Sequence, residues 1–360
     1  MTLGRALGPR AAGRRLLRRG GRDDFRLRVT GQQRTEPTIY FFALDSPAPG
    51  GGNKVIYRHV DVLNSAGLRA LALHQRQGFR YSWFVSDTPV IHAAAVAIGP
   101  QDLLVVPEGH LDIVVRNRIS PRHVVLNQGW SLTWSNDPGA AIGPLSNAEA
   151  LQEHYRGGHR PLAVIATSDY NAAFVRFAFP ELDVREVRLG IDPDRFFPSA
   201  VSPPPRIVYI PKHARAAEDA AMVIRMLQTR GTLAGWEISA LTGHSEDEFA
   251  AELRNARIFL SVSSLEGLGL PPMEAMASGC YVVGYHAIGG REFMHSDFSS
   301  PVESDDVLAL ARALEDAIVL DSHAPGLLRE RGMSAARFIR DQYSPAAERI
   351  AVLAAYSDLI

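Results

Sequence analysis

Cysteine, excess charge and long apolar runs are all scarce in this chain of 360 residues, and each scarcity excludes a class of protein. The single cysteine, Cys280, cannot form a disulfide within the chain, so we expect it to be a buried filler in a reducing, cytoplasmic compartment. The formal net charge of -1 argues against a nucleic-acid-binding protein that works through a broadly basic surface. No apolar run approaches the roughly 20 residues that a membrane-spanning helix requires.

The first 36 residues differ from the rest, because arginine is frequent there and acidic residues are rare. No apolar segment follows them, which excludes a secretory signal. We expect a disordered arm or a segment upstream of the native start. The alternative is peripheral contact with an anionic membrane at its inner face, to which each basic side chain would contribute about 1 kcal/mol.

The remaining sequence is that of an ordinary globular protein, long enough for two domains with cores of their own. Strands and helices are predicted to alternate, which indicates an α/β fold. Apolar runs predict strands at residues 38–44, 102–106, 123–126, 161–168, 206–211, 236–243 and 256–263. Helical spacing predicts helices at about residues 54–64, from Tyr170, before Gly231, and over residues 246–253, 307–320, 326–343 and 346–359.

The most informative segment is SSLEGLGLPPMEAMASG, residues 263–279. Glu266 follows a predicted buried parallel strand, and open α/β sheets bind their ligands at the carboxyl ends of such strands. Gly267 and Gly269 allow a ligand to approach the backbone closely. The prolines that follow fit a helix start, whose free N–H groups suit a diphosphate.

Glu274 falls in the first turn of that helix, where its carboxylate could accept hydrogen bonds from two vicinal hydroxyls such as those of a ribose. The simpler alternative is that Glu274 only complements the helix dipole and that Glu266 is a solvated loop residue. A strand end, two glycines, a proline start and a second carboxylate in one register favour the binding site.

This segment resembles the E-x7-E signature of retaining GT-B glycosyltransferases of the GT4 type, the glycosyl transferases group 1. A second stretch, GIDPDRFFP at residues 190–198, resembles the exit from the first domain of that family. The resemblance runs from about residue 38 to the end. It implies two Rossmann-like domains that face each other across a cleft, and a C-terminal helix that crosses back to the first domain.

The implied organisation is a basic arm at residues 1–36, an N-terminal acceptor domain at 37–198, a C-terminal donor domain at 199–345 and a crossover helix at 346–360. The implied activity is transfer of a hexose from a nucleotide-sugar donor to a glycan or glycolipid acceptor, with retention, in surface polysaccharide biosynthesis. No metal or other cofactor is expected. Asp192-Pro193-Asp194 mimics a metal-binding DxD motif, but the proline favours a turn.

The resemblance also implies roles for individual residues. Glu266 would position the donor sugar, Glu274 would hold the ribose, and Lys212 would contact the diphosphate. Arg215 follows Lys212 by three residues where the family places an arginine five residues before the lysine, so its donor contact stays open. The other implied site residues are Asn53, Gly51 and Gly52 between acceptor and diphosphate; the amides of Gly267, Leu268, Gly269 and Leu270 at the diphosphate; Thr242 and Gly243 at the base; and Glu108, Asn127 and Gln128 on the acceptor side.

Two other functions are consistent with parts of this pattern. The altered surroundings of Lys212 would suit a non-catalytic GT-B relative that binds a glycan or serves as a partner subunit. An NAD-dependent oxidoreductase would also use a strand, a glycine loop and a helix, but it should carry G-x-G-x-x-G followed by an acid, which is missing.

Overall fold

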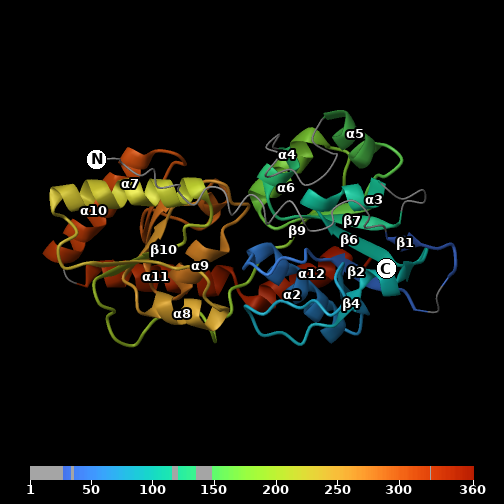
Figure 1. Ribbon diagram of the computed structural model, residues 1–360, viewed down its shortest axis with the longest axis horizontal. Coiled ribbons are helices and arrows are strands. Elements are labelled where there is room, and N and C mark those ends of the chain that lie inside the picture. Colours follow the sequence, from blue (N-terminus) through green and yellow to red (C-terminus); the bar gives the residue numbers. More distant parts are fainter. Residues whose placement is uncertain (1–26, 34–35, 116–120, 135–147, 325) are drawn as a thin grey trace, which may run out of the picture.

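The computed structural model describes residues 27–33, 36–115, 121–134, 148–324 and 326–360. Its elements form two lobes side by side, each built on a parallel sheet with helices on both faces (Figure 1). We call them the N-terminal lobe, which holds a seven-stranded sheet, and the C-terminal lobe, which holds a five-stranded sheet. The predicted α/β architecture is thereby confirmed.

The N-terminal sheet has the order β4-β3-β2-β6-β7-β8-β9. All neighbouring strands in it are parallel. Its strands are β2 (Ile39–Phe42), β3 (Ala70–His74), β4 (Val90–His92), β6 (Leu103–Pro107), β7 (His123–Asn127), β8 (Ala163–Ala166) and β9 (Val184–Glu186). The four strands predicted in this half are confirmed. Strands β4 and β9 were not predicted because each has three residues without an apolar run, and β3 was missed although its sequence, ALALH, is apolar.

Helices cover both faces of this sheet. They are α2 (Gly51–Ser65), η2 (Ala93–Ala95), η3 (Glu108–His110), α3 (Asp112–Val115), α4 (Trp130–Trp134), α5 (Ala148–Arg156) and α6 (Asp169–Ala178). Strand β2 shows why both faces of the sheet must be covered by helices. Ile39 and Phe41 pack in one apolar cluster, while Tyr40 and Phe42 pack in another on the opposite face.

Helix α2 begins earlier than predicted. The expected glycine loop at residues 50–53 is in fact the helix start, with Gly50 as an extended N-cap and the Asn53 amide donating to the Gly50 carbonyl at 3.0 Å. Glycine has a low helix propensity, so these glycines were predicted to form a loop, but glycine is tolerated in the first turn of a helix. The amides of Gly51 and Gly52 therefore lie at a helix N-terminus.

The C-terminal sheet has the order β11-β10-β12-β13-β14, again parallel throughout. Its strands are β10 (Arg206–Tyr209), β11 (Glu237–Ala240), β12 (Ile258–Ser261), β13 (Tyr281–Tyr285) and β14 (Ser299–Val302). Its helices are α7 (Ala214–Arg230), α8 (Glu246–Arg254), α9 (Leu270–Ala277), η4 (Gly289–Glu292), α10 (Val307–His323) and α11 (Leu327–Gln342). Cys280 is fully buried here, and burial raises the pKa of its thiol to about 12, so it packs as a filler as predicted.

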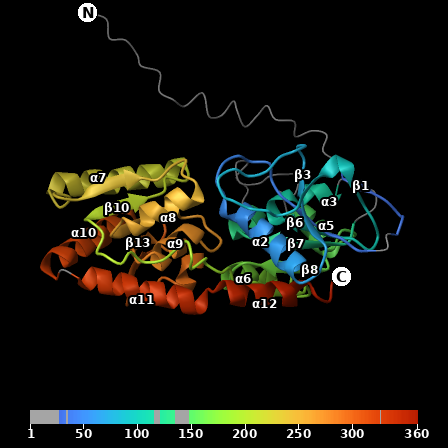
Figure 2. The same cartoon turned by 90° about the horizontal axis from the view of Figure 1, so that it is seen from below.

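The last helix, α12 (Pro345–Tyr356), leaves the C-terminal lobe and lies along the N-terminal one, continuing the line of α11 (Figure 2). Val352, Ala355 and Tyr356 join the apolar cluster that contains Ile39 and Phe41 of β2. The predicted crossover helix is confirmed. The N-terminal lobe therefore contains chain from the C-terminal end of the sequence, which ties the two lobes together.

The predicted arm ends sooner than residue 36. Residues 1–26 lie outside the described residues, but β1 (Arg28–Val29) pairs with β5 (Ala97–Ile98), and Leu27 is buried beside them. The predicted boundary at residue 36 was too late. The basic composition runs through Arg26 to Arg28, and Arg28 already lies in a strand. In the described part of the chain, no helix is both long and apolar enough to cross a membrane.

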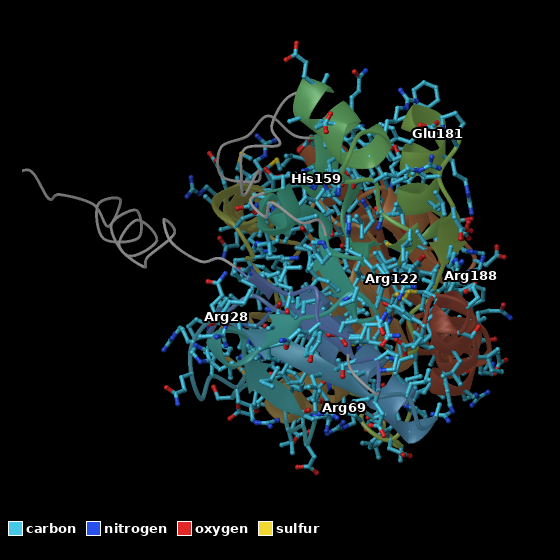
Figure 3. All side chains as sticks on the ribbon, turned by 90° about the vertical axis from the view of Figure 1, so that its right-hand side faces the viewer. Arg28, Arg69, Arg122, His159, Glu181 and Arg188 are labelled. Atoms are coloured by element: carbon cyan, nitrogen blue, oxygen red, sulfur yellow. The ribbon has the colours of Figure 1, made fainter. Side chains whose placement is uncertain are left out.

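Arginines at the far end of the N-terminal lobe lie apart from one another, Arg28 in β1 and Arg69, Arg122 and Arg188 in connecting segments (Figure 3). Each has its own partner: Arg28 the Ala94 carbonyl, Arg69 the Glu36 carboxylate, Arg122 the carbonyls of Gln101 and Leu359, and Arg188 the Asp169 carboxylate. These four arginines therefore make separate contacts and do not form one basic patch.

Candidate functional site

Both sheets carry a topological switch point, and the predicted site residues gather beside them. The chain reverses its direction of strand addition between β2 and β6 in the N-terminal sheet and between β10 and β12 in the C-terminal sheet. Ligands of open α/β sheets bind beside such points. The carboxyl end of β10 leads to Lys212, that of β12 leads to Glu266, and that of β2 leads to the start of α2.

The lobes meet where the starts of α2 and α9 approach each other. A Cβ placed on Gly51 would lie 2.9 Å from Cδ1 of Leu270, the first residue of α9. Val55 of α2 packs in the same apolar cluster as Leu268 and Leu270 of the C-terminal lobe. The two helix starts thus approach each other closely at position 51, where any larger residue would displace the end of the Leu270 side chain.

A second contact joins Gly267 to the N-terminal lobe. A Cβ on Gly267 would overlap the Gln128 carbonyl oxygen, and the Ser168 hydroxyl donates to the Gly267 carbonyl at 3.0 Å. The side-chain amide of Gln128 in turn donates to the Gly52 carbonyl at 2.9 Å. The predicted residues Gly51, Gly52, Gln128 and Gly267 therefore come together at the interface, and Ser168, which sequence reasoning missed, joins them.

Glu266 and Lys212 form an ion pair at the mouth of a pocket in the C-terminal lobe. The Lys212 ammonium lies 2.8 Å from both carboxylate oxygens of Glu266, and the Ser263 hydroxyl donates to Oε1 at 2.7 Å. The Glu266 side chain is 15% exposed, while that of Lys212 is half exposed. Other residues that line this pocket include Leu268, Gly269, Pro272 and His286.

The backbone of Glu266 is held by an unusual turn. Glu266 forms a parallel bridge with Ile288, whose φ is 68°, next to Ala287 with a φ of 50°. Positive φ is rare for a β-branched residue and costs about 1–3 kcal/mol. The Ile288 amide donates to the His286 ring at 3.0 Å, which stabilises the turn. Nothing in the local sequence indicated this strain beside the first motif glutamate.

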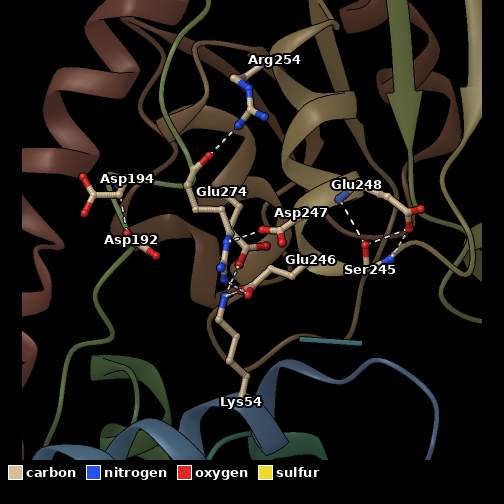
Figure 4. Close-up of polar contacts among 10 residues, drawn as sticks. Lys54, Asp192, Asp194, Ser245, Glu246, Asp247, Glu248, Arg254 and Glu274 are labelled. Carbon is tan, nitrogen blue, oxygen red and sulfur yellow. Dashed lines mark hydrogen bonds and ion pairs between the residues drawn. The ribbon is translucent and has the colours of Figure 1, made fainter. Parts of the chain in front are cut away.

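Glu274 lies inside a network of charges between the lobes (Figure 4). Its Oε1 accepts a hydrogen bond from the Lys54 ammonium of α2 at 3.0 Å, and the same ammonium pairs with Glu246 at the start of α8. Glu246 also pairs with Arg195, which contacts Asp247 at 2.9 Å. Sequence reasoning missed Lys54, Arg195 and Glu246, because no motif marks them.

Four other predicted site residues lie around this region in different settings. Arg215 is half exposed and pairs with Asp219 at 2.9 Å, one turn along α7, so the structure does not bring it to the Glu266 pocket. Thr242 and Gly243 are exposed in the loop just before Glu246, and Gly243 has a φ of 73°. Asn53 lies half-buried in the first turn of α2.

Glu108 and Asn127 are buried, although both were predicted on the acceptor side. The Glu108 Oε1 accepts from the Gly129 amide at 2.6 Å, and the Asn127 amide donates to the Thr133 hydroxyl at 2.9 Å. Burial raises the pKa of Glu108 to about 7, against the opposing effect of backbone amides. Their direct contact with an acceptor is not favoured, because each side chain faces inward and supports the loop that carries Gln128.

The Asp192-Pro193-Asp194 stretch forms a turn, in which the Asp194 amide donates to Oδ1 of Asp192 at 3.0 Å. Among the described residues, no group of three or more histidine, cysteine, aspartate or glutamate side chains has an arrangement suited to a metal ion.

Comparison with known proteins shows which proteins this chain resembles. The family model described as "Glycosyl transferases group 1" matches residues 226–319, a stretch that contains both Glu266 and Glu274. An alpha-1,6-glucosyltransferase of Actinobacillus pleuropneumoniae serotype 7 (strain AP76) is 27% identical over 256 residues, which cover 69% of this chain and 72% of that protein.

Solved structures show the same fold. Sucrose-phosphate synthase (tll1590) from Thermosynechococcus elongatus superposes with a TM-score of 0.67 at 15% identity, covering 90% of this chain and 99% of that one. Anabaena Alr3699/HepE, solved in complex with UDP and glucose, superposes with a TM-score of 0.63 at 13% identity, covering 90% and 100%. Both likenesses establish the two-lobed GT-B architecture.

Proposed function

We propose that this chain, which has the GT-B fold, is a member of the glycosyl transferases group 1, or GT4, family and transfers a hexose from a UDP-sugar. The acceptor in this proposal is a glycan or a glycolipid, and the anomeric configuration of the sugar is retained. UDP-glucose is the first donor to test, because the curated relative is an alpha-1,6-glucosyltransferase and the Anabaena structure contains UDP and glucose.

The observation that carries the proposal is the placement of the two motif glutamates at the junction of the lobes. Glu266 lies at the pocket beside β10 and β12, four residues before α9 starts, and Glu274 is the fifth residue of α9, just past the first turn in which it was predicted. Their separation along the helix start would let one carboxylate contact the sugar while the other contacts the ribose of a single donor.

The leaving diphosphate requires neutralisation, which we assign to Lys212 and to the free amides at the start of α9. Lys212 is half exposed, so its ammonium can turn toward a phosphate, while the Ser263 hydroxyl still donates to the Glu266 carboxylate. These groups would stabilise negative charge that develops as the bond between the anomeric carbon and the phosphate oxygen breaks. No metal has a part in this proposal.

Glu266 is assigned to the donor sugar, whose ring becomes cationic as that bond breaks. Its carboxylate is oriented by Lys212, Ser263 and the strained backbone at Ile288, so little reorganisation is needed during the reaction. Retention requires the acceptor hydroxyl to arrive on the face from which the diphosphate leaves. Gly51, Gly52, Asn53 and Gln128 would border that face from the N-terminal lobe.

The domain boundaries at residues 198 and 345, a cytoplasmic location and a role in surface polysaccharide biosynthesis are part of the same proposal. Membrane contact through the arginine-rich start stays a prediction from the sequence, because residues 1–26 lie outside the described ones. The non-catalytic alternative, a glycan-binding or partner subunit, becomes an outcome of the experiment.

The experiment is a screen for UDP release from UDP-glucose and other UDP-hexoses, with oligosaccharide and glycolipid acceptors added in turn. We expect acceptor-dependent release that Glu266→Gln and Glu274→Ala reduce. Glu248→Gln is the matched control, because Glu248 is exposed and only caps α8. Nucleotide binding without release from any donor would favour the non-catalytic alternative instead.

A further inference from the structure

Lysine is rare in this chain, and both lysines contact the motif glutamates. The sequence contains two lysines, Lys54 and Lys212, among its 38 lysine and arginine residues. Lys212 pairs with Glu266 inside the C-terminal lobe, whereas Lys54 reaches Glu274 from the N-terminal lobe. An ammonium is a compact charge with three donors, so it can bridge carboxylates that a planar guanidinium fork would hold in a different geometry.

We propose that Lys54 is a positioning residue that couples closure of the two lobes to donor binding, by holding Glu274 and Glu246 together across the interface. The inference rests on the proposed function, because it takes Glu274 as the ligand of the donor ribose. Lys54 lies outside the signature motif, and its role would be to prepare Glu274 of that motif for the donor.

The contacts of Lys54 are buried on every side. Its side chain is 12% exposed, and those of Glu246 and Glu274 are 5% and 9% exposed. The ammonium also lies 5.3 Å from the centre of the Phe196 ring. Pairs with so little solvent around them are screened weakly by salt and depend on correct geometry, unlike the exposed ion pairs of a protein surface.

The charge of Lys54 persists in this setting. Burial lowers the pKa of the ammonium, but the attraction of Glu274 and Glu246 outweighs this effect, and the pKa is raised overall. Lys54 therefore remains cationic when the lobes are closed. Without it, the two buried carboxylates would keep Arg195, which contacts Glu246 and Asp247, and the partly buried Arg58, which attracts both carboxylates but is itself paired with Glu348.

Lys54 joins three helices from the two lobes. It extends from α2 toward Glu246 at the start of α8 and Glu274 within α9, as Figure 4 shows. A backbone contact supports the same junction, since the Glu246 amide donates to the Trp83 carbonyl of the N-terminal lobe at 2.8 Å. Separation of the lobes would withdraw Lys54 from both glutamates at once.

This arrangement leaves part of Glu274 available to a ligand. Lys54 bonds to Oε1 of Glu274, so the other oxygen, Oε2, can accept a hydrogen bond from a ribose hydroxyl. A fixed carboxylate binds a hydroxyl with a smaller loss of side-chain entropy than a free one. Donor affinity is thus expected to be highest when the lobes are closed and Lys54 is in place.

The test compares Lys54→Met and Lys54→Arg with the wild type, using UDP-glucose kinetics and calorimetric titration with UDP. We expect Lys54→Met to raise the KM for UDP-glucose and the Kd for UDP by about tenfold or more, with a partial return in Lys54→Arg. Arg349→Met is the matched control, because Arg349 also contacts α2, at Ser65 near its far end, but through an exposed hydrogen bond. It should leave both constants unchanged.

A double variant separates positioning from stability. Lys54→Met with Glu246→Gln removes one buried negative charge along with the positive one, so the free energy of unfolding should return toward that of the wild type. The Kd for UDP should nevertheless stay raised, because Glu274 is still without Lys54. Recovery of UDP affinity together with stability would overturn the inference and leave Lys54 a structural residue.

Two further outcomes would also overturn it. An unchanged Kd in Lys54→Met would show that Lys54 does not prepare the donor site, and a lower Kd would show that it competes with the ribose. A wild-type protein that neither binds UDP nor releases it from any donor would instead count against the proposed function itself.

Discussion

Glu266 and Glu274 belong to one motif, yet they have different surroundings at the scale of single residues. Glu266 lies at a pocket mouth with a partly exposed lysine, and Glu274 lies in a nearly closed network with Lys54. The first environment suits a carboxylate that must respond to charge on a sugar. The second suits one that holds a fixed group throughout the reaction.

The two glutamates should therefore fail differently when they are changed. Glu274→Ala removes a charged acceptor, whose hydrogen bonds are worth roughly 1.5–3 kcal/mol each, and most of this loss should appear as a raised KM for the donor. Glu266→Gln keeps the shape but removes charge beside a ring that becomes cationic, so it should lower kcat more than it raises KM. Steady-state kinetics with the donor would measure both.

Equal effects of the two changes on KM and kcat would contradict these separate roles. A fully active Glu266→Gln with unchanged donor affinity in Glu274→Ala would make the motif structural.

Glu108 gives a pH-dependent prediction, because it is buried and one carboxylate oxygen, Oε2, has no hydrogen-bond partner. Burial raises its pKa from 4.5 to about 7. A raised folded-state pKa stabilises the fold below the unfolded value of 4.5, and that stability is lost as the pH rises through 7. The loss should total roughly 3 kcal/mol by pH 8.

Glu108→Gln should remove this dependence while its amide oxygen still accepts from the Gly129 amide. Urea unfolding at pH 5, 6, 7 and 8 would measure it, and the variant should gain stability relative to the wild type as the pH rises. Parallel stability curves for the two proteins would show that Glu108 does not titrate in this range.

At the scale of elements, the crossover helix α12 is important because its packing completes the core of the N-terminal lobe. Tyr356 is fully buried against the N-terminal sheet, with its ring 5.5 Å from that of Phe41 and its hydroxyl 3.3 Å from the His59 ring. The last turn of the described chain thus completes the core of the first lobe. Truncations near the C-terminus should act on the N-terminal lobe.

Tyr356→Ala should destabilise the protein by about 3–5 kcal/mol, because it leaves a cavity and an unpaired His59 nitrogen. Ile350→Ala on the same helix is the control, since Ile350 is 70% exposed and its loss should change stability by no more than about 0.5 kcal/mol. Denaturant unfolding would compare them. Similar small losses for both would show that α12 contributes little to the N-terminal core.

Elements with strong apolar runs could be predicted from sequence, and short ones could not. Strands β2, β6, β7, β8, β10 and β12 were predicted because parallel strands buried on both faces read as continuous apolar runs. Strands β4 and β9 have three residues each and are partly exposed, so their sequences carry no such signal. The start of α2 was placed too late, because glycine in a first helical turn looks the same in sequence as glycine in a loop.

At the scale of the whole molecule, the motif was predictable and its partners across the interface were not. Glu266 and Glu274 lie in a local pattern with a fixed spacing, so the sequence alone indicated a donor site. Lys54 is 220 positions from Glu274, and Gln128 approaches Gly267 from the other lobe. Such contacts depend on how the lobes pack, and no local spacing encodes them.

The packing of the lobes also explains why glycine is required at position 267. A Cβ on Gly267 would overlap the Gln128 carbonyl oxygen of the opposite lobe, whereas one on Gly51 would only displace the end of the Leu270 side chain. The interface is therefore built for close approach of two backbones, beside the pocket that holds Glu266 and Lys212. A donor bound there would contact residues of both lobes.

The measurement that tests the central claim most directly is a crystal structure of the protein with UDP. The ribose hydroxyls should lie within hydrogen-bond distance of the Glu274 carboxylate, with the diphosphate at Lys212 and the amides at the start of α9. UDP bound away from both glutamates would contradict the proposed donor site. So would UDP bound in a pocket of one lobe with no contact to Glu274, whose network with Lys54 and Glu246 would then be unchanged.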